Sequence, residues 1–308
     1  MELKELYLVA RSADLALKLL IQQTIRLEDS FARLNPSEID LLPFLRNLEP
    51  DAITATLLNH RYPNTAPVFF QTYLNHLHKA GILIQLPGNL FYISDTGAKR
   101  IRQFEKQKSE ILEGISPLPV NDLMDLASRL NEITDACLKI GTPSGNSCIQ
   151  FSRMRILELD PPLMYRIYGF LNEWVAFRSD AESAVRKGYD VSGHVWDILT
   201  ILWVERKLPV DRLVEIIINR GFSSIETDQS IELICKKGWC GIENREIHIT
   251  SFGIEIRTIA EETIDHYYYS PLKNFSIQYL QQVRQMLILF HRNTPVLDEK
   301  IENRSDKP

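Results

Sequence analysis

The sequence predicts a mainly helical protein with small β-hairpins, built from one structural unit that occurs twice. Three observations carry this prediction. Apolar residues recur at helical spacing through most of the chain, a helix end followed by a short hairpin occurs twice, and the landmarks of the two occurrences are nearly equally spaced. The chain has 308 residues, of which 44% are hydrophobic and 24% are charged, which suits two globular domains with hydrophobic cores.

The cysteine content and the apolar stretches indicate a compartment. Four cysteines in 308 residues are too few for a disulfide framework. The first 23 residues are amphipathic and contain six charged side chains, whereas a signal peptide has an unbroken apolar segment. The longest apolar stretches stop well short of the ~20 residues that a membrane span needs. The sequence therefore predicts a cytoplasmic protein with no membrane partner.

The internal repeat is clearest between residues 73–83 and residues 230–240. Each segment ends a helix with basic residues, a glycine and two apolar residues, as expected at a helix C-terminus. A hairpin follows, with turn residues at 87–89 and at 243–245, and a new helix then begins. Gly81 and Gly238 are 157 residues apart, and Gly97 and Gly253 are 156 residues apart. The two segments are therefore expected to be copies of one unit.

Three further helices precede the hairpin in each copy. They are expected at 35–48, 52–59 and 67–79 in the first copy, and at 192–205, 209–219 and 221–237 in the second. The resulting order is helix, helix, turn, helix, two-stranded wing, helix. This order is the winged helix-turn-helix plan. The predicted fold class is therefore mainly α with small β wings, as two winged helix-turn-helix units in pseudo-duplication plus extra packing helices.

A family resemblance follows from these motifs. The Leu-x-x-x-Gly-apolar step at residues 77–83, followed by Ser-Asp-Thr-Gly at 94–97, resembles MarR-type winged-helix regulators. In the second half, residues 177–180 and 263–271 are similar to SalK-like helical proteins. The resemblance covers about residues 30–110 and 165–290. It implies a winged-helix fold, DNA as a partner and a homodimer, although the wing tip at 87–89 lacks the Arg or Lys of MarR-type wings.

The remaining helices set the expected domain organisation. Amphipathic helices are expected at 3–26, 121–138 and 278–292, and their apolar stripes should pack between the copies in one shared core. The most linker-like stretch is 141–147. We expect an N-terminal winged-helix domain with flanking helices at 1–140, a linker at 141–162, a C-terminal winged-helix domain at 163–293 and a flexible tail at 294–308.

Motifs for catalysis and metal binding are weak. Cys235 and Cys240 with His248 lack a fourth ligand and the usual zinc spacing, so buried thiols are the simpler interpretation. The chain has no nucleophile elbow, Walker loop or dinucleotide fingerprint. Asp265 and His266 are adjacent on a helix and would point about 100° apart. The sequence predicts a protein that is not an enzyme and needs no cofactor or metal.

Charge counts favour the first copy for DNA binding. Residues 34–110 carry a net charge of +1, whereas residues 192–265 carry −5. The third helix of the first copy also presents polar side chains that suit base edges, and basic residues near it suit phosphates. The predicted base-reading residues are Gln71, Thr72, Asn75 and His76, and the predicted phosphate contacts are Arg61, Lys79, Lys99 and Arg100.

Two functions stay open at this point. The leading prediction is a winged-helix transcription regulator that contacts DNA through the first copy and uses the second copy for packing or for a ligand or partner. The alternative is an interaction or small-molecule-binding scaffold in which both winged helices have lost DNA binding. The tyrosines at 267–269, with Trp174 or Trp196, are candidates for lining a pocket for a small-molecule effector.

Overall fold

The computed structural model describes residues 3–25, 41, 42, 45, 48, 51–62, 64–153 and 161–295. Within these residues the protein is mainly helical and carries small antiparallel sheets, which confirms the predicted fold class at this level. The helix expected at 35–48 and the tail expected at 294–308 lie almost wholly outside the described residues.

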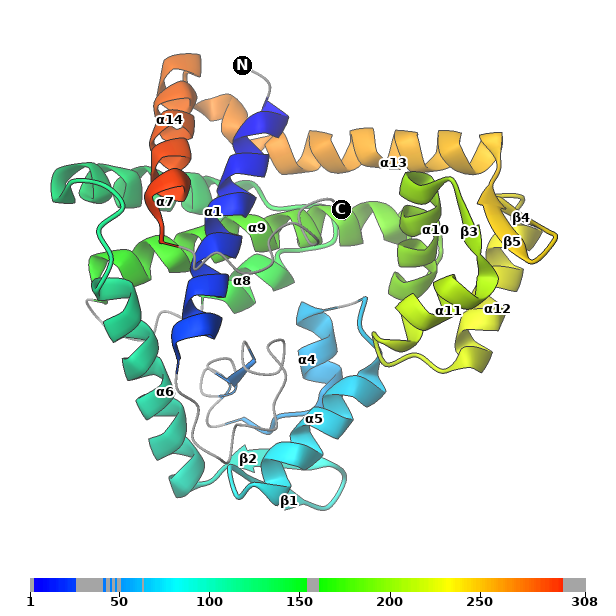
Figure 1. Ribbon diagram of the computed structural model, residues 1–308, viewed down its shortest axis with the longest axis horizontal. Helices are drawn as coiled ribbons and strands as arrows, with labels where there is room; N and C mark the ends of the chain where they lie inside the picture. Colours follow the sequence, from blue (N-terminus) through cyan, green and yellow to red (C-terminus); the bar gives the residue numbers. More distant parts are fainter. Residues whose placement is uncertain are drawn as a thin grey trace.

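A frame of long helices surrounds α9 (Leu163–Gly188), which lies at the centre of the molecule (Figure 1). Buried residues occur around nearly the whole circumference of α9, which is typical of a helix enclosed by others. The rest of the frame consists of α1 (Leu3–Thr24), α6 (Asp95–Glu113), α7 (Val120–Ile140), α8 (Ser147–Arg153), α13 (Ser251–Tyr269), the 3-10 helix η1 (Pro271–Asn274) and α14 (Ile277–Asn293).

The segment expected as a linker contains the helix α8. The backbone N–H groups of Cys148 and Ile149 donate to the two carboxylate oxygens of Asp180 at 2.8 and 2.9 Å. Asp180 is a buried residue of α9, so α8 is capped by the neighbouring helix rather than by its own sequence. Burial raises the pKa of Asp180, and the two backbone hydrogen bonds oppose that rise. These bonds fix α8 against α9.

The N-terminal unit comprises residues 51–113. Its elements are α4 (Ala55–Arg61), α5 (Pro67–Lys79), the hairpin of β1 (Leu83–Leu86) and β2 (Leu90–Ile93), and α6. α5 matches the predicted helix, because Pro67 occupies its first turn and Gly81, at φ 73°, follows its end. α4 begins three residues later than predicted. Ile53 is extended there and pairs with Phe91 of β2, and the Thr54 side chain then caps the helix.

The C-terminal unit comprises residues 193–269. Its elements are α10 (Gly193–Glu205), β3 (Lys207–Pro209), α11 (Val210–Ile218), α12 (Ser224–Lys236), β4 (Cys240–Glu243), β5 (Glu246–Ile249) and α13. The strand β3 is absent from the sequence prediction. It pairs with β5, with Leu208 opposite Ile247, to give the sheet order β3-β5-β4. Three residues are too few to show the alternation that identifies a strand in a sequence.

The helix that follows each hairpin begins with the same set of hydrogen bonds. Ser94 Oγ accepts from the N–H of the third residue of α6 at 2.9 Å and donates to the Gly81 carbonyl at 2.7 Å. Thr250 Oγ1 accepts from the third residue of α13 at 3.0 Å and donates to the Gly238 carbonyl at 2.6 Å. One hydroxyl therefore caps the new helix and also ties it back to the end of the preceding one.

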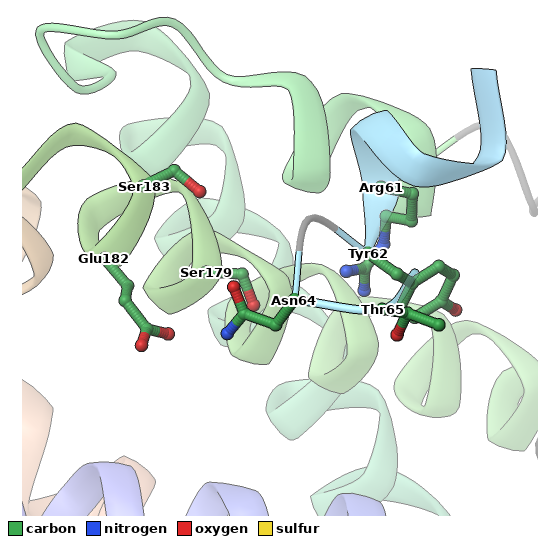
Figure 2. Close-up of a pocket in the computed structure, with 7 residues that line it drawn as sticks. All are labelled: Arg61, Tyr62, Asn64, Thr65, Ser179, Glu182 and Ser183. Atoms are coloured by element: carbon green, nitrogen blue, oxygen red, sulfur yellow. The ribbon is translucent and has the colours of Figure 1, made fainter. Parts of the chain in front are cut away.

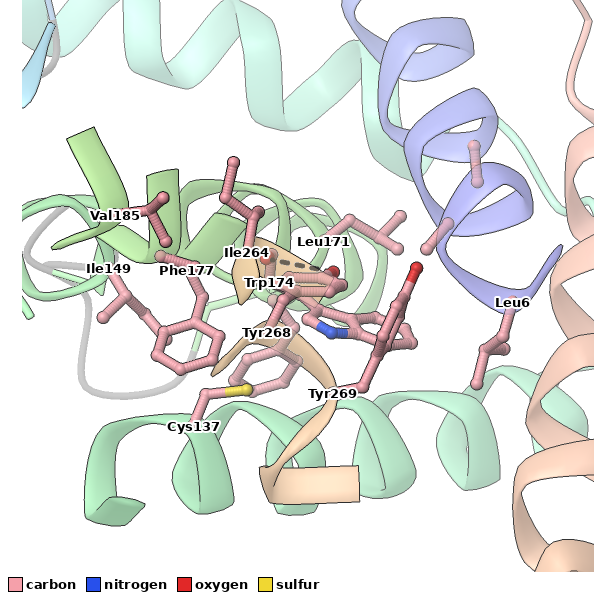
Figure 3. Packing of buried hydrophobic residues seen from close by; sticks show 14 of the residues in the cluster. Leu6, Cys137, Ile149, Leu171, Trp174, Phe177, Val185, Ile264, Tyr268 and Tyr269 are labelled. Atoms are coloured by element: carbon pink, nitrogen blue, oxygen red, sulfur yellow. Dashed lines mark hydrogen bonds between the residues drawn. The ribbon is translucent and has the colours of Figure 1, made fainter. Parts of the chain in front are cut away.

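The described residues form two hydrophobic cores, whereas the sequence predicts one shared core. The larger core joins α1, α7, α9 and α14 to the C-terminal unit, and Trp174, Phe177 and Tyr268 lie at its centre (Figure 3). Tyr268 Oη donates to the Trp174 carbonyl at 3.5 Å. The buried residues of the second core all lie between 41 and 104, and Ile25 and Phe151 pack against them. The three flanking helices therefore pack with the C-terminal unit, and the N-terminal unit has a core of its own.

Candidate ligand cavity and candidate nucleic-acid face

Five of the eight predicted DNA-contacting residues lie on α5. Thr72, His76 and Lys79 are exposed, and Gln71 and Asn75 are half-buried. Gln71 Nε2 donates to Asn75 Oδ1 at 3.2 Å, so these two amides bond to each other on the helix surface. The opposite side of α5 is buried in the core of the N-terminal unit through Phe70, Tyr73, Leu74 and Leu77. The five predicted residues therefore lie on the outward side of one helix.

Lys99 and Arg100 lie near the C-terminal end of that helix. Both belong to the first turns of α6, where Lys99 is exposed. Arg100 Nη1 donates to the carbonyl of Ala80 at 3.2 Å, which holds α6 against the end of α5. The structure thus places Arg100 beside the backbone that follows Lys79.

Arg61 lies apart from the other predicted residues. It is the last residue of α4, at the N-terminal end of α5, whereas Lys79 ends α5 after a helix of 13 residues, or about 18 Å. Its side chain lines a small pocket of about 130 Å³ with Ser179 and Ser183 of α9 (Figure 2). The guanidinium also lies over the Tyr62 ring at 4.7 Å. Arg61 therefore faces the helical frame and not the outward side of α5.

The turn between α4 and α5 docks onto the C-terminal unit. The Ala66 N–H donates to the Arg220 carbonyl at 3.2 Å, and Asn64 Nδ2 donates to Asp197 Oδ1 at 3.0 Å. The Arg220 guanidinium in turn forms an ion pair with Asp197. These four residues are called the turn-to-turn contact below, because Arg220 belongs to the corresponding turn between α11 and α12.

A cavity of about 570 Å³ lies between α1, α9, α10, α11 and α13. Its apolar wall includes Tyr7, Trp203 and Ile264, and its polar wall includes arginines and carboxylates from several helices. Asn64, Asp197 and Arg220 also line it, so the turn-to-turn contact forms one side of the cavity. Its volume is within the range of small-molecule sites.

Two arginines of this wall are locked by ion pairs and aromatic rings. Arg178 Nη1 donates to Asp265 Oδ1 at 2.8 Å, and Arg178 also pairs with Glu261. Arg257 Nη1 donates to the other oxygen of Glu261 at 2.7 Å. The Arg257 side chain lies 5.2 and 5.1 Å from the centres of the Trp196 and Trp203 rings, and the residue is 4% exposed. This part of the wall is therefore neutralised and rigid.

Two polar groups of the wall that are not exposed lack such partners among the described residues. The half-buried carboxylate of Glu182 forms no hydrogen bond or ion pair there, and the buried hydroxyl of Tyr269 has no hydrogen-bond partner. Burial raises the pKa of Glu182, and three neighbouring arginines oppose that rise. Unpartnered polar groups in a cavity are costly in the empty state, so they favour a ligand that satisfies them.

The structure brings together two segments, 177–180 and 263–271, that are far apart in the sequence. The structure brings Arg178 of the 177–180 segment and Asp265 of the 263–271 segment together, and it shows that Asp265 bonds Arg178. The sequence of α13 contains a local pattern that indicates its charged face. Arg257, Glu261 and Asp265 are four residues apart in sequence, which places them on one side of a helix.

Other site types lack support within the described part of the chain. No group of three or more His, Cys, Asp or Glu residues there is arranged to hold a metal ion. None of its helices is long and apolar enough to cross a membrane. Comparisons with protein-family models, curated proteins and solved structures found no match for this chain.

Proposed function

We propose that the protein is a tandem winged helix-turn-helix protein that binds a small molecule in its central cavity. The observation that carries the proposal is the cavity itself. It combines a wall that is already ordered by the Arg178, Arg257 and Glu261 ion pairs with the unpartnered groups of Glu182 and Tyr269. A preformed, partly apolar cavity with a few converging polar groups is the usual form of a small-molecule site.

The order and pairing of the elements support the duplication. Each unit has extended backbone, two helices, a hairpin and a further helix in the same order. The bridge between Ile53 and Phe91 corresponds to the pair of Leu208 and Ile247, because each links the residues before the second helix to the last strand of the hairpin. The matched hydroxyl caps at Ser94 and Thr250 add a second, independent correspondence.

Indole is a suitable probe of the cavity, because it is a small planar ring that fits an aromatic wall. We expect indole to bind with a Kd of about 1 mM or tighter, as measured by calorimetry and by saturation-transfer NMR. Ile201→Trp places a larger side chain on the cavity wall and should weaken binding by about tenfold or more.

The matched control is Ile218→Trp, which makes the same change at an exposed residue outside the cavity wall. It should leave indole binding unchanged. Equal binding of indole by the wild type and Ile201→Trp would show that indole does not bind in this cavity. If indole and the amino acids tested below all fail to bind, the cavity is not a ligand site.

DNA binding by the N-terminal unit is a second candidate function. The specific observation is that exposed polar residues of α5 lie on one side, with Lys79, Lys99 and Arg100 around its C-terminal end. Phosphate contacts supply most of the affinity of a non-specific complex, and amide side chains can read base edges. Because Arg61 faces α9, we no longer expect it to contribute to the phosphate contacts.

A salt-titrated binding assay on random duplex DNA tests this candidate. Lys79→Ala and Lys99→Ala should each weaken binding and flatten its salt dependence, because each removes one phosphate contact. Arg61→Ala and Asp228→Ala serve as controls, and neither should weaken binding. Failure of the wild type to bind at about 50 mM salt, where the phosphate contribution is large, would exclude DNA binding by this unit.

A further inference from the structure

Glu182 and Arg220 face the same cavity from different elements. Glu182 lies on α9, and Arg220 lies in the turn between α11 and α12. The described residues contain no ion pair between these two side chains within 4 Å. Burial lowers the pKa of Arg220, and the charge of Glu182 acts against that effect. The two opposite charges therefore face one cavity without forming an ion pair with each other.

The other charges of the wall are either paired or exposed. Arg220 itself pairs with Asp197, but its side chain is 40% exposed and has further N–H donors, whereas Lys4, Arg11 and Glu205 lie on the exposed part of the wall. Glu261 and Asp265 neutralise Arg178 and Arg257 through direct contacts. Arg186, one turn beyond Glu182 on α9, acts on the pKa of Glu182 but does not line the cavity. A carboxylate and a guanidinium thus line the same cavity of about 570 Å³ without pairing with each other.

Another part of the wall is apolar. Ile201 and Trp203 come from α10, Ile216 from α11, and Ile264 from α13. Aliphatic and aromatic surfaces of this kind stabilise a bound apolar group, because binding removes both apolar surfaces from water. A ligand that fits the whole cavity therefore carries opposite charges at one end and an apolar group at the other.

We propose that the cavity binds an α-amino acid with a large apolar side chain, with its ammonium group on Glu182 and its carboxylate on Arg220. The inference rests on the proposed function, since it names the ligand class for the same cavity. An α-amino acid carries both charges on one carbon atom. It can therefore form two charge-assisted contacts in the cavity while its side chain covers the apolar wall.

The test uses L-tryptophan and two analogues that each lack one charged group. Tryptamine lacks the carboxylate, and indole-3-propionate lacks the ammonium group. We expect L-tryptophan to bind at least tenfold more tightly than either analogue by calorimetry, because tryptamine cannot contact Arg220 through a carboxylate and indole-3-propionate cannot contact Glu182 through an ammonium group. L-leucine with isoamylamine and 4-methylvalerate forms a second set of the same design, and either set can support the proposal.

Two variants test which charged group of the ligand contacts Glu182 and which contacts Arg220. Glu182→Gln should weaken L-tryptophan about tenfold or more and leave indole-3-propionate unchanged, because only the amino acid has an ammonium group. Arg220→Gln should weaken indole-3-propionate and leave tryptamine unchanged. Circular dichroism and thermal unfolding of each variant check that the fold is retained.

The outcomes separate this inference from the cavity function on which it rests. If indole binds in the cavity but the amino acids bind no more tightly than their analogues, the amino-acid proposal is wrong and the cavity remains a ligand site. If Glu182→Gln leaves amino-acid affinity unchanged, the proposal is also wrong. If indole and both amino acids all fail to bind, neither proposal stands.

Discussion

Gly97 and Gly253 each allow a loop backbone to pack directly against a helix. Each is the third residue of the helix that follows a hairpin. A Cβ atom at Gly97 would lie 2.0 Å from the carbonyl oxygen of Ile82, and one at Gly253 would lie 2.1 Å from that of Trp239. Both distances are far below van der Waals contact and involve backbone atoms that side-chain rotation cannot move. Close approach, rather than an unusual φ, is why glycine is needed here.

We therefore expect Gly97→Ala and Gly253→Ala each to lower the free energy of unfolding by roughly 1–3 kcal/mol, as overpacking does elsewhere. Gly188→Ala is the control, because a Cβ there has no heavy atom within 4 Å. That change should be neutral or stabilising by up to about 1 kcal/mol. Urea denaturation measures all three, and equal midpoints for the three variants would contradict the close-approach explanation.

The turn-to-turn contact joins the α4–α5 turn of the N-terminal unit to α10 and to the α11–α12 turn of the C-terminal unit. Asn64 of the N-terminal unit bonds Asp197, which also holds Arg220, and all three side chains line the cavity. Gly221, at φ 86°, lies beside this contact, and a Cβ there would lie 2.9 Å from Phe69 Cβ of α5. The start of α5 is therefore held by the same residues that a cavity ligand would touch.

Removal of this contact should loosen the α4–α5 turn locally. We expect Asn64→Ala to increase amide hydrogen exchange in residues 64–70 several-fold, because the turn loses its side-chain bond to α10. Gln71→Ala is the matched control on α5, since Gln71 bonds Asn75 within its own helix. Exchange in α12 should change in neither variant. Equal exchange in Asn64→Ala and the wild type would show that the contact does not hold the turn.

The whole molecule is organised around α9 and not around a symmetric pair of units. α1, α7, α13 and α14 pack in the larger core with the C-terminal unit, while the N-terminal unit forms the lower part of the molecule in Figure 1. α6 joins the two cores, because Ile101 and Phe104 belong to the smaller one and Leu112 to the larger one. The two units thus have the same element order but different surroundings. The C-terminal unit shares the larger core with the flanking helices, whereas the N-terminal unit packs around the smaller core.

The sequence by itself determined the local elements. Pro67 and Gly81 bound α5, turn residues at 87–89 and 244–245 connect the strands of the two hairpins, and the spacing of apolar residues gives α1, α7 and α14. These predictions succeeded because caps, turns and helical periodicity act over a few neighbouring residues. The five polar residues of α5 could be placed on one helix for the same reason.

Only the tertiary structure decided which distant residues meet. The pairing of Ile53 with Phe91, the capping of α8 by Asp180 and the inward position of Arg61 all depend on contacts with other elements. The cavity is the clearest case, since Arg178 and Asp265 are 87 residues apart. No local propensity specifies such a pair. It forms because the apolar faces of α9 and α13 pack together and bring the two charges within hydrogen-bonding distance.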